Sequence, residues 1–420
     1  MELFLSSFAS RERGDYVDEI VNVTSIDTTI RSDAAAEFRH GTSMLIVLTA
    51  MHFVVDVVAS QIIPLWPTLE QRYQFPTFWM LCIWGFGSSF CQLGFAMIGD
   101  RAASRWLVWL GPATSCVCLG CLGLFNLPVM LAVLLAISGM GIAAFHPEGA
   151  TLSGNCWPNA RSRAVSIFAM GGFLGQSVGP PCSGWVVDHF GMSGLSSGIA
   201  IGLALMLALR LVYRPMVSAA RTHSTATSNV RGAFAGRHGL LLLLLAAGTV
   251  RVIAAAGVPI ALAYWLKSIQ FSDGEIGLVQ SPFLAGIGFG GLLAAIGVRP
   301  EWERFALWFV PLLAVPFLLA MPTLTGFALS ASAGAVGLFL GIAQPVFISY
   351  GQQLFPESQR VASSITMGVS WGTGGAIAAA LIDICSRRQS FDIAFMAFAA
   401  AVVLSSVLCA LLPKTQRPSA

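Results

Sequence analysis

Charged residues are scarce in this sequence. Asp, Glu, Lys and Arg make up 10% of its 420 residues and apolar residues make up 56%, whereas soluble domains carry about 25% charged residues. A soluble protein with so few charges would lack a solvated surface. Apolar stretches of about 20 residues recur along almost the whole chain, and a helix of that length crosses a hydrocarbon layer of about 30 Å. The sequence therefore predicts an all-α polytopic membrane protein that lies in a lipid bilayer.

Other missing features narrow the possible functions. The chain has no glycine-rich phosphate-binding loop that ends in lysine, so the sequence does not support ATP as the energy source. No nucleophile can be grouped from the sequence with a base and an orienting partner. We therefore do not expect an enzyme, and we expect neither a cofactor nor a nucleic-acid partner.

The cysteines give no sign of a disulfide framework or a metal site. Nine are present, and most lie inside apolar stretches. Cys116, Cys118 and Cys121 share one predicted span, but that segment has no histidine or carboxylate nearby. Because cysteine is also a common small apolar residue in helices, packing is the better explanation.

The first 39 residues differ from the rest because they are polar and more acidic than basic. They lack the basic-then-apolar order of a secretory signal. We interpret residues 1–39 as a mobile or loosely docked N-terminal extension on the cytoplasmic side.

Apolar stretches separated by proline, glycine and charged residues predict twelve transmembrane helices. The predicted spans are 41–63, 77–98, 106–125, 129–154, 163–187, 192–213, 239–265, 275–297, 303–321, 325–352, 361–385 and 391–412.

Lys and Arg predict the orientation of these spans, because they gather on the cytoplasmic side of membrane proteins. With both termini in the cytoplasm, eighteen of the 23 basic residues fall at or near the cytoplasmic side, four fall on the opposite side, and Arg251 alone lies near the middle of a span. We expect a monomer in the plasma (inner) membrane with both termini cytoplasmic.

The two halves of the chain resemble each other. At offsets of 196 to 198 residues, "YQFP" at 73 falls on "IQFS" at 269, "CWPNA" at 156 falls on "LFPES" at 354, and His146-Pro147 falls on Gln344-Pro345. The shared offset indicates an internal duplication, which is typical of transporters with two six-helix halves around a central path. The predicted organisation is an N-terminal half at 40–213, a basic cytoplasmic linker at 214–238, a C-terminal half at 239–413 and a cytoplasmic tail at 414–420.

Four motifs resemble a known family. They are "HFVVDVVAS" at 52–60, "GMGIAAFHPEGA" at 139–150, "GGFLGQSVGPPCSGW" at 171–185 and "YGQQLFPESQR" at 350–360. Together they resemble the major facilitator superfamily and, within it, the fosmidomycin resistance protein family. The resemblance covers roughly residues 40–413 and implies the major facilitator fold and efflux of a drug or toxic metabolite. The Gly-x-x-x-Gly-Pro pattern in the third motif is associated in the superfamily with exchangers rather than symporters.

Placing an ionisable residue inside a membrane span costs free energy, so each such residue indicates a structural or functional role. His52 and Asp56 are one helical turn apart, and His146 and Glu148 lie in the inner half of span four. We expect these four residues to carry proton coupling, with Asp56 and Glu148 as the carriers, because burial favours the protonated form of a carboxyl. Other readings stay open: Asp56 and His52 as a static pair that joins helices, and Glu148 as a solvated group at a helix end.

Several further residues are candidates for substrate binding, gating or helix packing. Arg251 is expected to attract an anionic substrate, or else to form a structural ion pair. The residues expected to line the substrate path with it, or else to tie helices together by hydrogen bonds, are Gln176, Gln344 and Gln352. The residues expected to gate the cytoplasmic side are Asp100, Arg101 and Arg105. The residues expected to allow close helix packing and a bend are Gly175, Gly179, Pro180 and Gly184.

These features favour a secondary transporter that exchanges protons for a small organic compound and exports that compound by alternating access. Two alternatives remain from the sequence. One is a proton-coupled importer of a small metabolite, and the other is a non-transporting membrane sensor or scaffold on the same fold.

Overall fold

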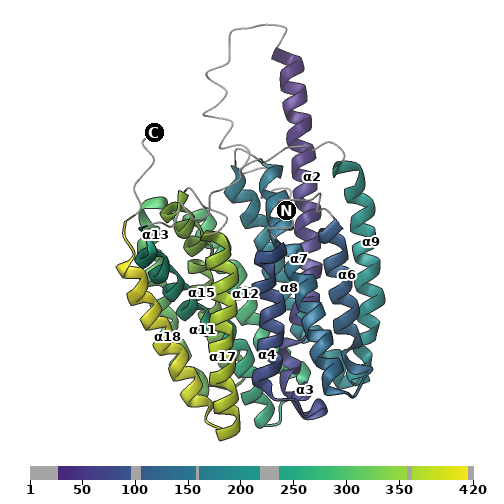
Figure 1. Ribbon diagram of the computed structural model, residues 1–420, viewed down its shortest axis with the longest axis vertical. Helices are drawn as coiled ribbons and strands as arrows, with labels where there is room; N and C mark the ends of the chain where they lie inside the picture. Colours follow the sequence, from purple (N-terminus) through teal and green to yellow (C-terminus); the bar gives the residue numbers. More distant parts are fainter. Residues whose placement is uncertain (1–26, 96–105, 158–159, 218–235, 357–361, 415–420) are drawn as a thin grey trace.

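The computed structural model describes residues 27–95, 106–157, 160–217, 236–356 and 362–414, and every regular element in these ranges is a helix (Figure 1). The α-helices are α2 (Asp27–Ser60), α3 (Trp66–Tyr73), α4 (Thr77–Gly85), α6 (Leu107–Gly120), α7 (Pro128–Cys156), α8 (Arg161–Phe190), α9 (Ser197–Val217), α11 (His238–Ser268), α12 (Asp273–Gly297), α13 (Glu303–Phe309), α14 (Val315–Ala320), α15 (Gly326–Leu354), α17 (Ser370–Arg388) and α18 (Phe391–Leu411). Shorter 3₁₀ and π turns join some of them into longer spans.

The predicted spans can all be found in the described part of the chain. Ten helices there are long and apolar enough to cross a membrane, and the apolar helix Leu107–Gly123 is somewhat shorter. With the 30 residues of α8, which rise about 45 Å at 1.5 Å per residue, the number reaches twelve. The predicted fold class, an all-α polytopic membrane protein of two helical halves, is confirmed.

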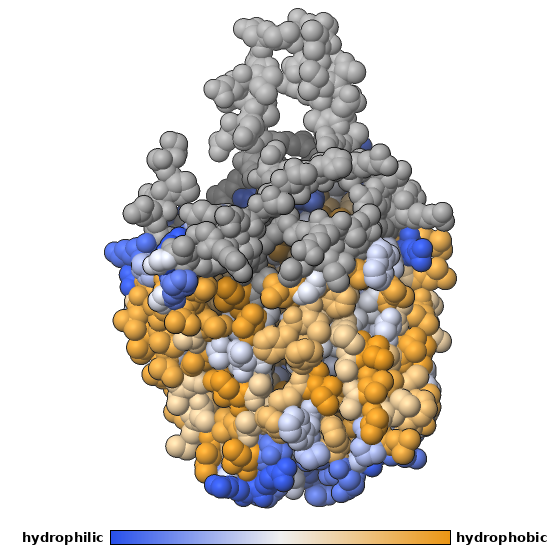
Figure 2. Space-filling model, in the orientation of Figure 1, coloured by the Kyte–Doolittle hydropathy of each residue, from blue (hydrophilic) through white to orange (hydrophobic). Residues whose placement is uncertain are grey.

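The surface has the pattern that a bilayer requires. Figure 2 shows a broad apolar band around the helices, with hydrophilic residues below it and along its upper margin. Large side chains of the apolar helices such as Phe327, Leu242 and Phe86 are more than half exposed. Such exposure is stable in lipid, where apolar side chains need no protein cover.

Local sequence explains where single spans change their helical form. The span Glu303–Thr323 is built from α13, η8 (Val310–Ala314), α14 and η9 (Met321–Thr323). Pro311 and Pro316 each stand at the start of one of these pieces, because proline lacks an N–H and suits the first turn of a helix. By contrast, α7 continues through Pro147 and α15 continues through Pro345.

The first helix begins earlier than the sequence predicts. We expected a polar extension up to residue 39 and a span from 41, but α2 begins at Asp27 and continues to Ser60. In Figure 1 its first turns project beyond the rest of the bundle. Hydropathy marks where lipid begins, whereas the backbone hydrogen bonds of a helix continue into polar sequence.

Two long contacts join the halves. α8 packs along both α2 of its own half and α12 of the other half, and α17 packs against α4. The second contact contains two π turns that lie together, η2 (Phe86–Phe90) and η11 (Ser364–Val369). Such single-turn π segments are frequent at functional positions. The halves therefore meet along α8–α12 and α4–α17.

Candidate functional site

Three helices of the first half bring ionisable side chains together. His52 and Asp56 lie one turn apart on α2, His146 lies on α7 and Gln176 lies on α8. The Nε2 atoms of His52 and His146 are 3.5 Å and 3.3 Å from the two Asp56 carboxylate oxygens. The Gln176 side-chain amide donates a hydrogen bond of 2.8 Å to Asp56 Oδ2. We call these four residues the Asp56 cluster.

Backbone carbonyls fix the orientation of both imidazole rings. His52 Nδ1 lies 2.7 Å from the carbonyl oxygen of Phe168, and His146 Nδ1 lies 2.8 Å from that of Ile142. A carbonyl oxygen only accepts hydrogen bonds, so each Nδ1 must carry the proton. In the neutral tautomer, each Nε2 then presents a lone pair to the Asp56 carboxylate.

The facing lone pairs in the Asp56 cluster favour the presence of a proton between them. Two imidazole lone pairs beside a carboxylate repel one another unless a proton lies between them, on the carboxyl or on an imidazole ring. Asp56 is 2% exposed and His52 is 6% exposed, so water does not screen this repulsion. A shared, movable proton is therefore what this arrangement of donors and acceptors favours.

Aromatic rings and a glycine enclose the cluster. The His52 ring stacks on Phe168 with a centroid distance of 4.1 Å, and the Phe145 ring centroid is 5.7 Å away. A Cβ on Gly172 would overlap the His52 ring. Glycine at this position therefore lets α8 approach the two ionisable residues of α2.

His52, Asp56 and His146 also form the single metal-type donor set found in the described part of the chain, with ligand atoms within 4.8 Å of one another. Two imidazoles and a carboxylate suit a divalent transition metal. The Gln176 amide donates a hydrogen bond to Oδ2 of the same carboxylate. Such a donor orients a carboxylate that takes up either a proton or a metal ion.

The second half carries a related pair. The Arg251 guanidinium on α11 donates a hydrogen bond through Nη1 to Gln344 Oε1 on α15, and it stacks over the Phe347 ring at 4.8 Å. The sequence offset places Gln344 at the counterpart of His146 and Arg251 beside the counterpart of Asp56. Equivalent helices of the two halves thus carry different groups. Those of the first half carry an acid with two histidines, and those of the second half carry a permanent cation with an amide.

The remaining candidates lie apart from these two groups or outside the described ranges. Glu148 is half-buried on α7, outside the cluster of metal-type donors. Gln352 donates a hydrogen bond of 2.8 Å to Ser363 Oγ. The predicted gating residues Asp100, Arg101 and Arg105 lie outside the residues that the structure describes.

Glycines of α8 lie directly against neighbouring backbone. A Cβ on Gly175 would overlap the backbone oxygen of Phe53, one on Gly179 would overlap that of Val57, and one on Gly184 would overlap that of Asp273. The Pro180 carbonyl accepts a hydrogen bond of 3.1 Å from Ser183 Oγ. These small residues set the distance from α8 to α2 on one side and to α12 on the other.

A second polar group, which sequence reasoning missed, joins the halves at one end of the bundle. The Asp273 carboxylate accepts hydrogen bonds from Thr68 Oγ1 at 2.8 and 2.9 Å and pairs with Lys267 Nζ at 2.8 Å. The backbone N–H groups of Asp273 and Gly274 donate to the two Asp188 carboxylate oxygens at 3.1 and 2.9 Å. We call Thr68, Asp188, Lys267 and Asp273 the Asp273 cluster; Thr68 and Asp188 belong to the first half.

We expect Asp273→Asn to weaken this end of the bundle. Asparagine keeps an acceptor for Thr68 but loses the ion pair with Lys267, and hydrogen bonds to charged groups contribute about 1.5–3 kcal/mol. A loss of about 1.4 kcal/mol raises the population of the separated conformation tenfold. Distances between spin labels at the exposed positions Phe190 and Ile269 should then become longer and broader.

Glu275→Gln serves as the control for this prediction. Glu275 lies in the same first turn of α12, but it forms a capping box with Ser272 and takes no part in the contact between halves. Unchanged label distances in Asp273→Asn would show that the Asp273 cluster does not hold the halves together.

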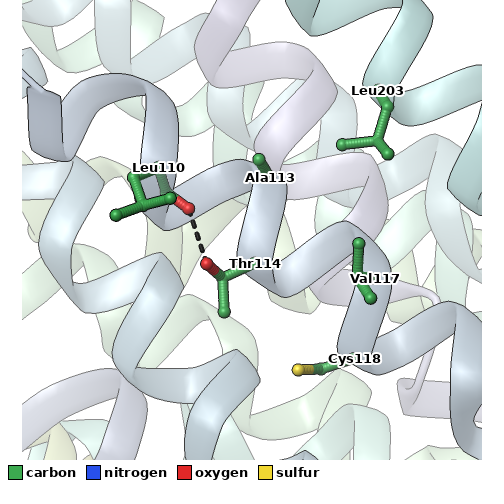
Figure 3. A pocket seen from close by; sticks show the side chains of 6 residues that line it. All are labelled: Leu110, Ala113, Thr114, Val117, Cys118 and Leu203. Atoms are coloured by element: carbon green, nitrogen blue, oxygen red, sulfur yellow. Dashed lines mark hydrogen bonds between the residues drawn. The ribbon is translucent and has the colours of Figure 1, made fainter.

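A groove of about 300 Å³ lies elsewhere, between α6 and Leu203 of α9 (Figure 3). Its lining is otherwise Leu110, Ala113, Thr114, Val117 and Cys118. The Thr114 hydroxyl already donates a 2.7 Å hydrogen bond to the Leu110 carbonyl, and Leu110 is 55% exposed. The groove offers no charged group and faces outward, so it is no part of the polar site.

Fold and site together define a class of protein: a membrane-embedded carrier for small molecules, made of two helical halves with ionisable groups buried in each. Within this class, the Major Facilitator Superfamily model matches residues 48–379. The chain belongs to the Major Facilitator Superfamily, and the family and fold support a secondary transporter.

Individual relatives agree with this assignment. The chain is 25% identical over 393 residues to the "Uncharacterized MFS-type transporter YfnC" of Bacillus subtilis (strain 168), covering 89% of this chain and 93% of that protein. It is 20% identical over 360 residues to the "Fosmidomycin resistance protein" of Escherichia coli (strain K12), covering 83% and 87%. The resemblance drawn from the motifs is confirmed.

Solved structures show the same fold. A bacterial homologue of the human lysosomal transporter Spinster, in an inward-facing and unoccupied conformation, superposes with a TM-score of 0.62 at 16% identity, covering 89% of this chain and 95% of that one. The occupied inward-facing structure gives a TM-score of 0.61 at 16% identity, with coverages of 89% and 96%.

Proposed function

We propose that this protein is a proton-coupled antiporter that exports a small organic compound across the plasma (inner) membrane by alternating access. The observation that carries the proposal is the Asp56 cluster. In it the Nδ1 atoms of two imidazoles are hydrogen-bonded to backbone carbonyls, and their Nε2 atoms face one buried carboxylate. A proton is needed there when the site is closed, and it can leave when the site opens to water.

The proton and the compound then bind alternately rather than together. Hydration and new partners change the proton affinity of Asp56 when the helices around it separate. Glu148, half-buried two residues beyond His146 on α7, is proposed as a second carrier nearer the cytoplasm. A compound that binds better when Asp56 has lost its proton produces exchange rather than symport, because a ligand shifts an equilibrium through its differential affinity.

The Asp273 cluster is proposed as the contact that breaks and re-forms during alternating access. It joins the halves at the end that holds Lys267, which the distribution of basic residues places on the side opposite the cytoplasm. We infer that it must break when the transporter opens to that side. The name of the Escherichia coli relative supports a drug or toxic metabolite as the exported compound.

Two experiments test the proposal. A growth screen of deletion and overexpression strains against a compound panel identifies the substrate class and the direction of transport together. Proteoliposomes with an acid interior then test coupling, because the substrate should dissipate the pH gradient. Full coupling in both Asp56→Asn and Glu148→Gln would show that the assigned carriers are wrong, and absence of any substrate-dependent proton flux would favour a non-transporting scaffold.

A further inference from the structure

Arg251 is a buried cation without an anionic partner in the part of the chain that the structure describes. Its side chain is 4% exposed. Its described partners are the Gln344 amide oxygen and the face of the Phe347 ring, and the neutral thiol of Cys409 on α18 lies near enough to interact electrostatically. An amide and an aromatic ring carry no negative charge. Buried charges are otherwise paired with an opposite charge, because desolvation costs several kcal/mol per ion.

The unsatisfied part of the guanidinium is one particular edge. Nη1 is bonded to Gln344, while Nε and Nη2 have no hydrogen-bond partner among the described residues. Nε–H and the neighbouring Nη2–H point in parallel and form the fork that binds two oxygens of one acid group. The free edge therefore matches a carboxylate or a similar two-oxygen acid group better than a single halide ion.

Other unsatisfied polar groups nearby are hydroxyls rather than carboxylates. The Ser370 side chain on α17 and the Phe347 ring both lie against Gly248, which precedes Arg251 by three residues on α11 and so shares its face. Ser370 Oγ is fully buried and has no hydrogen-bond partner. Ser406 Oγ, on the adjoining helix α18, is also buried without a partner.

We propose that the Nε–Nη2 edge of Arg251 binds the acid group of the transported compound, so that the substrates are organic anions. This inference rests on the proposed transport function and deepens it by naming a substrate class. Because Arg251 is enclosed in this conformation, the helices around it must part before an anion can enter. Binding then stabilises the parted conformation through differential affinity.

A ligand-binding test on the purified full-length protein separates the possible anions. The probes are benzoate, octanoate and indole-3-acetate, each compared with its uncharged amide, and with chloride and phosphate at matched ionic strength. At least one carboxylate should raise the melting temperature by on the order of 2 °C more than its amide, since a ligand stabilises the state that binds it. Equal shifts from an acid and its amide in all three pairs, or an equal shift from chloride or phosphate, would overturn the proposal.

Two substitutions locate the site. Arg251→Gln should abolish the carboxylate shift, and Arg251→Lys should lose most of it, because lysine keeps the charge without the planar fork. Arg387→Gln is the matched control, because Arg387 forms an exposed pair with Asp383 and should leave the shift unchanged. The melting temperature of each variant without ligand reports whether it folds, and an undiminished shift in folded Arg251→Gln would contradict the assignment.

Asp56→Asn separates this inference from the proposed function. Asp56 lies in the other half, so this variant should keep a carboxylate shift while it loses proton coupling. The shift should be smaller than in the wild type, because neutral asparagine resembles the protonated state, which binds the compound less tightly. A carboxylate shift in a protein without coupled proton flux would leave the anion site standing and remove the antiport proposal. Coupled proton flux with compounds that have no acid group would support the antiport proposal and remove the anion site.

Discussion

Proteoliposomes that contain Asp56→Asn are expected to show no transport driven by a proton gradient, while the helix bundle stays folded. Asparagine has the shape of aspartate and still accepts a hydrogen bond from Gln176, which now donates to Asp56 at 2.8 Å. It cannot gain or lose a proton near neutral pH, and the two imidazoles lose the carboxylate that stabilises a proton between them, so we expect the cluster no longer to exchange one. Gradient-driven transport should fall to the level of empty vesicles.

Two comparisons make this result specific. Exchange of labelled for unlabelled substrate without a gradient should persist in Asp56→Asn, because that exchange needs the conformational change but no net proton movement. Asp392→Asn, an exposed carboxylate in the first turn of α18, should behave as wild type in both assays. Wild-type gradient-driven transport by Asp56→Asn would remove Asp56 from the mechanism.

Gly175→Ala is expected to destabilise the folded protein strongly. The added Cβ would overlap the backbone oxygen of Phe53 on α2, so α2 and α8 must move apart along their whole contact. Overpacking of this kind costs about 1–3 kcal/mol and occasionally more. The separation would also pull Gln176 and its neighbours away from Asp56. Thermal unfolding of the purified protein measures the loss.

The control for this prediction is Gly375→Ala. Nothing lies within 4 Å of a Cβ built on Gly375 in α17, and alanine is favoured over glycine inside a helix by about 1 kcal/mol. Gly375→Ala should therefore melt at the wild-type temperature or slightly above. Equal melting temperatures for the two variants would show that the α2–α8 contact tolerates a larger separation.

Much of the fold can be predicted from the sequence, because the bilayer requires a minimum apolar length of every span. The twelve predicted spans match the helices closely, and the largest difference is the start of α2 at Asp27 rather than at 41. That difference lies in polar sequence, where hydropathy carries no information about helix length. Tertiary packing sets the π turns η2 and η11, and no local pattern in the sequence indicates them.

The site is only partly predictable for a similar reason. The pairing of His52 with Asp56 follows from helical spacing, but the contact of His146 with Asp56 joins residues from different helices. The sequence leaves the partner of Gln176 open, and the structure shows that its side-chain amide bonds to Asp56. Helix periodicity gives the face of a residue, but the rotation of one helix against another decides which faces meet.

The Asp273 cluster is a contact between the halves that local rules of helix capping do not predict. Ser272 and Glu275 form a capping box at the start of α12, and this alone accounts for polar residues at a helix N-terminus. From the sequence alone, Asp273 and Asp188 are therefore interpreted as ordinary residues at helix ends. Their contact across the halves depends on the close approach of α8 and α12.

Proton release on substrate binding tests the central claim most directly. With a substrate found in the growth screen, the purified protein is mixed with that compound in weakly buffered solution that contains a pH indicator. Exchange at the Asp56 cluster predicts that wild-type protein releases protons into solution as the compound binds. It predicts that Asp56→Asn binds the compound with lower affinity and without proton release. Binding with no proton release in the wild type, or with proton uptake, would contradict antiport at this site.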